Sequence, residues 1–289
     1  MKKNRSNAIL VLILLVGLSL ILYPSLSDYY NSFHQSRAIV NYAETVAEIN
    51  TERYDALWQG AADYNARLGE RGIQWKLTDE QRAEYESLLN VTGTGIMGYI
   101  EIPEINCQLP IYHGTAESVL QIAVGHLEGS SFPVGGTGSH CILSGHRGLP
   151  SARLFTDLDK LREGDVFLLH TLDETLTYEV DQIRIVLPYE LDDLKIDPLR
   201  DFCTLVTCTP YGVNSHRLLV RGHRIENAPE AIQVRITGDA FQIDPVVVAP
   251  IVAIPMLLIL FILLLVNSAR RRRRREILSR MEVRTVETK

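Results

Sequence analysis

The sequence has few of the features that mark a metal or nucleotide site. Its 4 cysteines and 8 histidines do not combine into the paired spacing of a zinc site. The glycine-rich stretch GSSFPVGGTGS at 129–139 lacks the Gly-Lys-Ser/Thr ending of a phosphate-binding loop. The sequence therefore predicts no metal requirement and no cofactor.

Basic residues are scarce between the two ends of the chain. Residues 1–7 and 267–289 hold 12 of the 29 lysines and arginines but only 3 of the 35 acidic residues. The region between them keeps 17 bases and 32 acids, a net charge of about −15. Such an acidic surface argues against nucleic acid or an anionic membrane surface as its ligand.

Charged residues are absent from two stretches, 8–26 and 245–266, and each is close to the ~20 apolar residues that a membrane-spanning helix needs. Lys2, Lys3 and Arg5 precede the first stretch, and six arginines at 270–275 follow the second. Basic flanks belong on the cytoplasmic side. We therefore expect two membrane spans, both termini in the cytoplasm and the region between them outside the cell. A cleaved signal peptide is the alternative for the first stretch, and a nucleic-acid patch for the arginine run.

The soluble region divides into a helical part and a β-rich part. Residues 36–68 lack proline and space their apolar residues helically, which predicts a helix with a break near Gly60. A second helix is expected at 79–89, with Thr78 as its N-cap. Short β-rich runs separated by glycine and proline follow as far as residue 236, which is typical of a mainly β, closed or nearly closed barrel. Strands are expected at 97–102, 106–111, 141–143, 165–171, 176–187, 203–208 and 217–223.

Cys208 is the strongest candidate for a nucleophile. It ends an apolar, β-branched run that Thr209-Pro210-Tyr211-Gly212 stops, so it should lie at the tip of a strand. The next strand begins near Arg217 after a short loop, and an antiparallel pairing would bring Arg217 beside Cys208. His146 also follows an apolar strand and enters a loop rich in glycine and proline. Three strand tips would then carry a nucleophile, an oxyanion donor and an acid/base.

These residues resemble a sortase, and specifically a class C, pilus-polymerising sortase of Gram-positive bacteria. The TLxTC signature is met by residues 204–208, TLVTC, the downstream arginine by Arg217, and the histidine by His146 in LSGHRG. The class C character comes from TCTPYGVNSHRLLVRG and HRGLPSARLFTDLDKL. The resemblance implies an eight-stranded sortase barrel with an N-terminal helical extension.

The resemblance also implies a reaction. Cys208 attacks the Thr–Gly bond of an LPxTG-like sorting signal and forms a thioester, His146 transfers protons, and Arg217 stabilises the oxyanion. A lysine amine of the next pilin subunit then accepts the acyl group. The alternatives are a cell-wall-anchoring sortase that uses a peptidoglycan-precursor amine, a hydrolytic cysteine peptidase, and a catalytically silent pilin-binding protein. The substrate-binding residues stay unassigned.

One departure from class C is visible. The Asp-Pro-aromatic lid motif expected before the barrel is missing, because the only Asp-Pro pairs are at 197–198 and 244–245. Trp75 is a substitute candidate for the lid, although packing on the barrel exterior is the favoured role. The predicted domains are a cytoplasmic tail (1–7), a transmembrane helix or uncleaved signal anchor (8–26), a helical extension with the lid region (27–93), the catalytic barrel (94–237), a linker (238–244), a second transmembrane helix (245–266) and a basic cytoplasmic tail (267–289).

Other residues compete for the same roles. His216 is the main rival acid/base, because it lies near Cys208 in sequence. Arg221 shares a strand face with Arg217, but four residues displace it by roughly 13 Å. Cys203 should point to the opposite face from Cys208 and is interpreted as a small buried hydrophobe. Burial is also favoured for Cys107 and Cys141, with a bridge between them left open.

Overall fold

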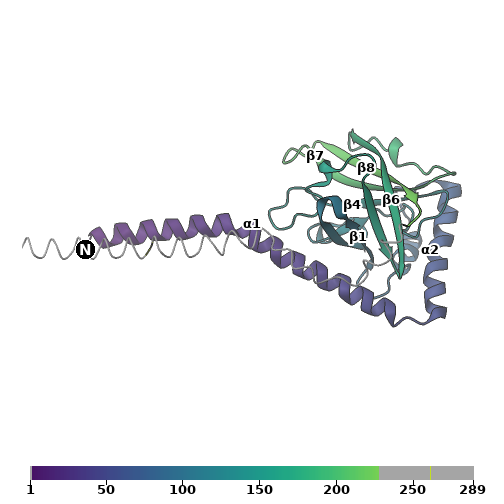
Figure 1. Ribbon diagram of the computed structural model, residues 1–289, viewed down its shortest axis with the longest axis horizontal. Coiled ribbons are helices and arrows are strands. Elements are labelled where there is room, and N and C mark those ends of the chain that lie inside the picture. The colour runs from purple at the N-terminus through teal and green to yellow at the C-terminus, as the bar shows by residue number, and fades with distance from the viewer. Residues whose placement is uncertain (1, 228–260, 262–289) are drawn as a thin grey trace, which may run out of the picture. The chain divides into compact units, whose positions relative to one another are not determined.

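The computed structural model describes residues 2–227 and Phe261, with only the backbone of residues 2–13. The chain divides into two units, Met1–Gly238 and Asp239–Lys289, and the elements below belong to the first (Figure 1). Its helices are α1 (Lys2–Ala47), α2 (Thr51–Arg71), α3 (Asp79–Ser87) and the short α4 (Glu117–Leu120). Three 3₁₀ turns, η1 (Pro103–Ile105), η2 (Leu158–Lys160) and η3 (Asp192–Leu194), lie in connections.

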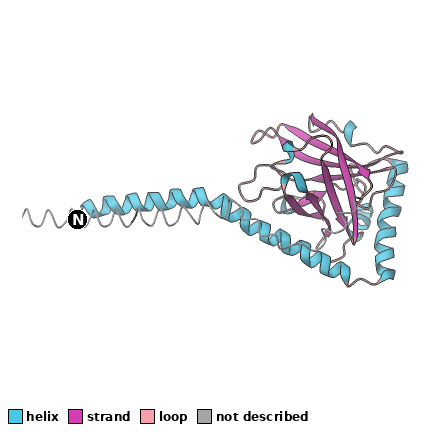
Figure 2. Ribbon diagram, viewed as in Figure 1, coloured by secondary structure: helices cyan, strands magenta, loops and turns pink. Residues whose placement is uncertain are grey.

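A closed barrel of eight strands follows the helices (Figure 2). The order around the barrel is β1-β2-β3-β4-β7-β8-β6-β5. The strands are β1 (Ile96–Ile102), β2 (Cys107–His113), β3 (Val124–His126), β4 (Ser139–Ser144), β5 (Val166–Thr171), β6 (Glu174–Val186), β7 (Asp201–Thr209) and β8 (His216–Ile225). The expected mainly β barrel with an N-terminal helical extension is confirmed.

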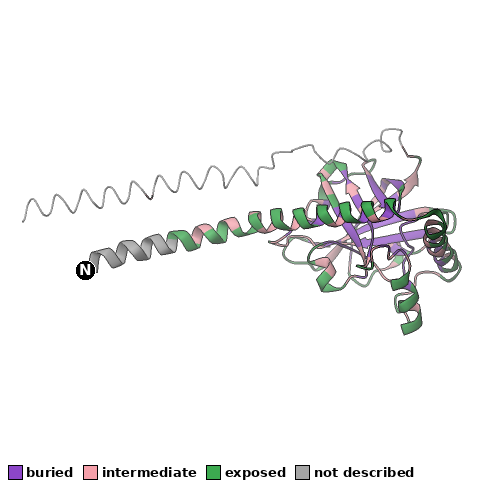
Figure 3. Ribbon diagram, turned by 90° about the horizontal axis from the view of Figure 1, so that it is seen from below, coloured by how far each residue is buried: buried purple, intermediate pink, exposed green. Residues whose placement is uncertain are grey.

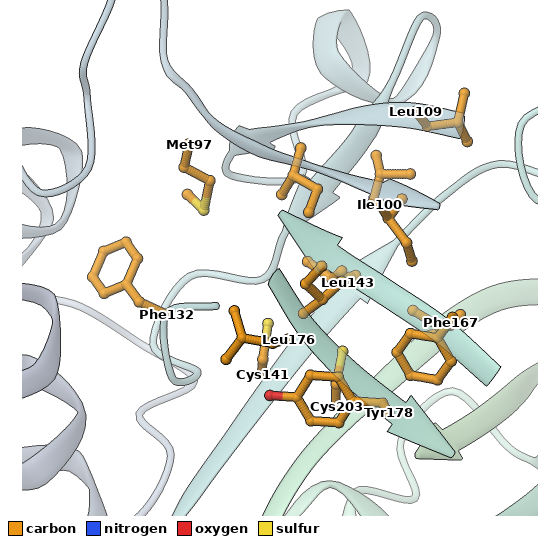
Figure 4. Packing of buried hydrophobic residues seen from close by; sticks show 14 of the residues in the cluster. Met97, Ile100, Leu109, Phe132, Cys141, Leu143, Phe167, Leu176, Tyr178 and Cys203 are labelled. Atoms are coloured by element: carbon orange, nitrogen blue, oxygen red, sulfur yellow. The ribbon is translucent and has the colours of Figure 1, made fainter. Parts of the chain in front are cut away.

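Strand alternation determines what each face of the barrel contacts. Side chains from all eight strands point inward and join one large core, in which Cys141, Leu143, Cys203 and Leu205 are buried. The strands are largely buried in Figure 3, and Figure 4 shows Cys141, Leu143 and Cys203 among the side chains of this core. Ile142 of β4 and Leu219 of β8, which have the opposite parity, form a smaller cluster with Val186 of β6 and Leu194 of η3. The outer face of β4, β7 and β8 is therefore also partly apolar.

The helical extension packs against the barrel. Tyr42 of α1 is fully buried and its hydroxyl donates to Met97 O at 2.9 Å. Tyr64 and Leu68 of α2 and Tyr85 of α3 are buried in the same core. These contacts bury apolar area that an isolated barrel would expose, which favours folding of helices and barrel together.

Two helix boundaries can be compared with the expectations from the sequence. The expected N-cap Thr78 is confirmed, and it forms a capping box with Gln81 at the start of α3. The expected break near Gly60 is wrong, because α2 runs through it and the chain breaks between Ala47 and Thr51. Asn50 accounts for the break, since its side chain accepts the Arg53 N–H at 2.9 Å and caps α2.

The strand pattern missed β3, whose three residues are too few to show alternation. Three histidines, His126, His140 and His170, are buried in the fold. Burial is tolerated because polar groups distant in sequence face their ring nitrogens. His140, for example, contacts Lys195 O at 2.9 Å and Thr204 Oγ1 at 2.7 Å.

Within residues 2–227 and at Phe261, no helix combines the length and apolarity that crossing a membrane requires. The expected second span, 245–266, lies outside the described residues. The two spans therefore stay predictions.

Candidate active site

Cys208 and Arg217 lie directly opposite each other on antiparallel strands. They are a register pair of β7 and β8, and both side chains are partly buried. The loop that joins the strands is tight because Pro210 O accepts the N–H groups of Val213 and Asn214 at 3.1 and 3.0 Å. This turn returns the chain so that the second residue of β8 faces the penultimate residue of β7.

The loop also orients the Arg217 guanidinium. Its Nη1 donates to Asn214 O at 3.2 Å and to His216 O at 3.0 Å. Both acceptors are carbonyls at the start of β8, so the cation is held at the strand tip near the thiol. A fixed positive charge with several N–H donors is what a developing oxyanion requires.

His146 reaches the same strand tip through a parallel pairing. Ser144, the last residue of β4, pairs with Val206 of β7. The two strands stay together past this point, because the Gly145 N–H donates to Val206 O at 3.1 Å and the Thr207 hydroxyl donates to Gly145 O at 2.8 Å. His146 follows Ser144 by two residues, and Cys208 follows Val206 by two residues, so this register carried past the end of β4 would bring His146 beside Cys208.

The three candidates lie at one tip of the sheet. Cys203 and Val220 point into the barrel core, so Cys208 of β7 and Arg217 of β8, which differ from them by odd numbers along their strands, point outward. His146 follows the end of β4 at the same tip of the sheet. The outward neighbours of Cys208 and Arg217 belong to the small cluster of Ile142, Leu219 and Val206. Cys208 and Arg217 thus lie on the outer face of β7 and β8, beside an apolar patch.

The backbone at His146 is restrained on its other side as well. His146 O accepts the Phe155 N–H at 3.1 Å, and the fully buried Phe155 ring packs on Gly145. A Cβ at Gly145 would lie 2.7 Å from that ring. A glycine is therefore required at position 145, because any larger residue would prevent Phe155, at the end of the β4–β5 loop, from packing against the start of that loop.

Glu117 is a residue near the site that sequence reasoning missed. Its Oε2 lies 3.5 Å from His146 Nε2, a nitrogen that is buried and has no hydrogen bond among the described residues. The pKa of Glu117 is lowered, first by a hydrogen bond from Gln121 and then by His146. No motif marked Glu117, because it comes from the short α4, far from the other site residues in sequence.

The competing candidates have other contacts. Arg221 pairs with Thr204, four residues before Cys208, and makes a two-pronged ion pair with Asp181 at 2.9 and 3.0 Å. His216 precedes Arg217 in β8 and contacts Ser215 Oγ at 2.9 Å. Arg147, the residue after His146, is largely buried and paired with Asp159.

The four cysteines differ in accessibility, and all are free thiols. Cys141 and Cys203 are neighbours on β4 and β7 and are buried in the core, whereas Cys208 is partly exposed. Burial raises the pKa of the Cys203 thiol well above its usual range and that of Cys107 to about 12. The disulfide between Cys107 and Cys141, which the sequence neither predicted nor excluded, is not formed. Cys107 and Cys203 therefore lack the thiolate character that a nucleophile requires. Burial acts in the same direction on Cys141, but hydrogen bonds with Cys203 and His126 outweigh it and lower the pKa of this thiol, which lies buried in the barrel core, where a substrate cannot reach it.

Trp75 lies in the loop between α2 and α3, and its side chain is 45% exposed. The Gln74 N–H donates to Gly129 O at 3.1 Å in the β3–β4 loop. Ile73 packs on the outward cluster that contains Ile142. The loop therefore follows the outer face near the middle of β4, several residues before His146, which does not favour Trp75 as a cover for Cys208.

A cleft of about 620 Å³ lies on another side of the molecule. Tyr42 and Tyr54 of the helices and Tyr99 and His170 of β1 and β5 line it. In the barrel order, β1 and β5 are separated from β7 by other strands in both directions. This cleft is distinct from the catalytic candidates.

Comparison with known proteins agrees with this geometry. A family described as "Sortase domain" matches residues 100–225, which include all three catalytic candidates. Sortase C1 of Streptococcus agalactiae is 55% identical, with a TM-score of 0.65, over 66% of this chain and 100% of that one. The chain belongs to the sortase family.

Further relatives specify the class. Sortase C of Streptococcus pneumoniae is 44% identical, with a TM-score of 0.60, over 67% of this sortase and 99% of that chain. Sortase D of Bacillus subtilis is 33% identical over 134 residues, which are 44% of this sortase and 63% of the relative. The structural neighbours support class C, and the protein is a cysteine transpeptidase.

Proposed function

We propose that this sortase assembles pili by joining pilin subunits through an LPxTG-like sorting signal. The observation that carries the proposal is the register that pairs Cys208 with Arg217, together with the parallel pairing of β7 with β4, the strand that leads into His146. A sortase C from Clostridium perfringens, solved with the C-terminal cell wall sorting motif, is 45% identical over 66% of this chain and 100% of that one, with a TM-score of 0.59. It supports a sorting-motif peptide as the substrate class.

The chemistry proceeds in two acyl transfers. The Cys208 sulfur attacks the threonine carbonyl carbon, and Arg217 donates hydrogen bonds to the oxyanion that forms. The C–N bond to glycine breaks as His146 gives a proton to the leaving amine, which leaves a thioester. In the second step a lysine ε-amine of the next pilin attacks the thioester and His146 takes its proton. The C–S bond breaks, an isopeptide bond remains, and the proton on His146 is available to return to the Cys208 sulfur.

The first test traps the thioester. The full-length chain is incubated with an LPxTG-like peptide, and intact mass is measured after acid quenching. We expect an adduct equal to the peptide up to its threonine in the wild type and in Cys203→Ala, and none in Cys208→Ala. An adduct that survives Cys208→Ala would overturn the assignment of the nucleophile.

The second test identifies the acceptor. The trapped thioester is offered a pilin domain with a surface lysine, a peptidoglycan-precursor amine, or water alone. Faster loss of the adduct with the pilin, together with a cross-linked product, supports polymerisation. Preference for the precursor amine would indicate a cell-wall-anchoring enzyme, and equal loss in water would indicate a hydrolytic peptidase.

We infer from the sequence that the protein is held in the cell membrane by residues 8–26 and 245–266, with the catalytic barrel outside and both termini in the cytoplasm. The supporting observations are the two uncharged stretches and their basic flanks. Protease added to intact protoplasts should digest the barrel and spare a tag placed after Lys289. Digestion of that tag would contradict the two-span topology.

A further inference from the structure

Three polar side chains on one face of α1 bind the loops around the catalytic histidine. Asp28, Asn31 and Gln35 are spaced by three and four residues, so they lie on the same side of the helix over a length of roughly 10 Å. Each makes a hydrogen bond to a backbone group of the barrel's loops. None of these bonds joins elements that are close in sequence.

The first two bonds hold the β4–β5 loop. The Asn31 Nδ2 donates to Ser151 O at 2.7 Å, and Asp28 Oδ1 accepts the Arg153 N–H at 2.8 Å. This loop starts at His146 and is closed at its base by the bond from the Phe155 N–H to His146 O. Fixing the loop at Ser151 and Arg153 therefore restrains the His146 backbone.

The third bond holds the segment that carries Glu117. The Gln35 side chain is buried, and its Nε2 donates to Ile122 O at 2.7 Å. Ile122 follows α4 and its N–H donates to Val119 O at 3.0 Å. Because Glu117 begins α4 and lies 3.5 Å from His146 Nε2, Gln35 fixes the turn that faces the imidazole.

We propose that Asp28, Asn31 and Gln35 are positioning residues, which hold His146 in its catalytic place from two sides. The structure shows α1 in contact with both loops that flank the imidazole. His146 itself is held by the bond from the Phe155 N–H to its carbonyl oxygen and faces Glu117 across 3.5 Å. A displacement of about 1 Å in a catalytic group can cost on the order of 10²-fold in rate. The helix before the barrel is thereby part of the active site.

The test compares two variants at Asp28 and two at Asn31, all in the full-length chain. At each position one variant keeps the size of the side chain and the other is alanine. Asp28→Asn keeps an acceptor oxygen, whereas Asp28→Ala removes it. Asn31→Asp keeps the size of the side chain but loses the N–H donor, and Asn31→Ala loses both. Asn41→Ala is the matched control, because Asn41 is exposed on the same helix.

The main measurement is the pH dependence of Cys208 alkylation by iodoacetamide, read by mass spectrometry of the Cys208 peptide. It needs no sorting-signal substrate, so it stays informative if the proposed substrate is wrong. The double variant Asp28→Ala/Asn31→Ala should shift the profile toward that of His146→Ala, and turnover of a cleaved peptide should fall about tenfold with KM changed less than twofold. Asp28→Asn and Asn41→Ala should keep the wild-type profile.

The single variant Asn31→Asp keeps the proposal testable if the double variant folds poorly. Melting temperature within a few degrees of wild type, together with a shifted profile, supports positioning. A wild-type profile in folded Asn31→Asp and in the double variant would overturn the proposal. If Asp28→Asn and Asp28→Ala shift the profile equally, the proposal is also overturned. The charge of Asp28, and not its acceptor oxygen, would then be responsible.

Discussion

At the residue scale, strand position separates chemically identical side chains. Arg217 and Arg221 have the same charge and the same strand face, but only Arg217 pairs with Cys208. Arg221 is bound by Asp181 and stacks over the Phe202 ring at 4.3 Å. The first arginine is available to a reacting carbonyl, and the second stabilises the outer face of the barrel.

Arg217→Lys should therefore slow acyl transfer by roughly 10²–10³, about 2.7–4 kcal/mol, because an ammonium cannot replace several planar N–H donors. Arg221→Lys should leave the rate within a few-fold of wild type and lower thermal stability instead. Thioester formation in single-turnover experiments and melting curves measure the two effects. Equal rate losses in two folded variants would contradict this separation.

Glu117→Gln should lower kcat/KM throughout its pH profile, because a neutral amide replaces the carboxylate that lies 3.5 Å from His146 Nε2. The effect should be modest, a few-fold in rate, since the Glu117 side chain is 70% exposed and solvent screens the pair. Glu104→Gln is the control, because Glu104 is exposed in η1. An unchanged profile in Glu117→Gln would exclude an electrostatic role.

At the scale of elements, the segment before the barrel is predictable where local chemistry determines it. The capping box at Thr78 could be predicted because it needs only neighbouring residues. The break at Asn50 was missed because Gly60, a poor helix former, is the more visible signal, although α2 packing tolerates it. The position of Trp75 depends on long-range contacts of Ile73 and Gln74 that no local pattern shows.

Trp75→Ala should leave the rate of Cys208 alkylation within about twofold of wild type, because the loop that carries Trp75 contacts the β3–β4 loop. The substitution suits this purpose better than deletion of 51–90, which would remove the buried Tyr64, Leu68 and Tyr85 from the core. Alkylation kinetics with a small thiol reagent give the answer, with far-UV circular dichroism as the check on folding. A several-fold rise in folded Trp75→Ala would show that this residue covers the site.

At the scale of the whole molecule, the barrel and the three strand tips could be predicted, whereas the contacts between distant segments could not. His146 follows a strand that the apolar pattern shows, Cys208 lies at the end of another, and Arg217 lies at the start of a third. Glu117 and the buried His140 depend on groups that only the folded chain brings near. A three-residue strand such as β3 is likewise defined by its neighbours.

Acid should destabilise the fold through His140. Burial lowers its pKa from 6.5 to about 4, so the stability that the neutral ring contributes is present above pH 6.5 and is lost as the pH falls toward 4. The loss should be about 3 kcal/mol, at 1.36 kcal/mol per pH unit. Urea unfolding measures the free energy of unfolding at pH 7 and at pH 4.5. The difference between these two free energies should be smaller in His140→Gln than in wild type. His34→Gln, at an exposed position, should keep the wild-type difference.

The parallel pairing of β4 with β7 also constrains when activity can arise during folding. The chain leaves β4 at Ser144, forms β5 and β6, and returns to pair with β4 only at Asp201. Contacts between segments so distant in sequence form slowly, because loop-closure entropy must be overcome first. The histidine and the thiol therefore meet only once the barrel has closed, so regain of catalysis during refolding reports completion of the barrel, and a nascent chain that has not yet reached β7 cannot acylate a substrate.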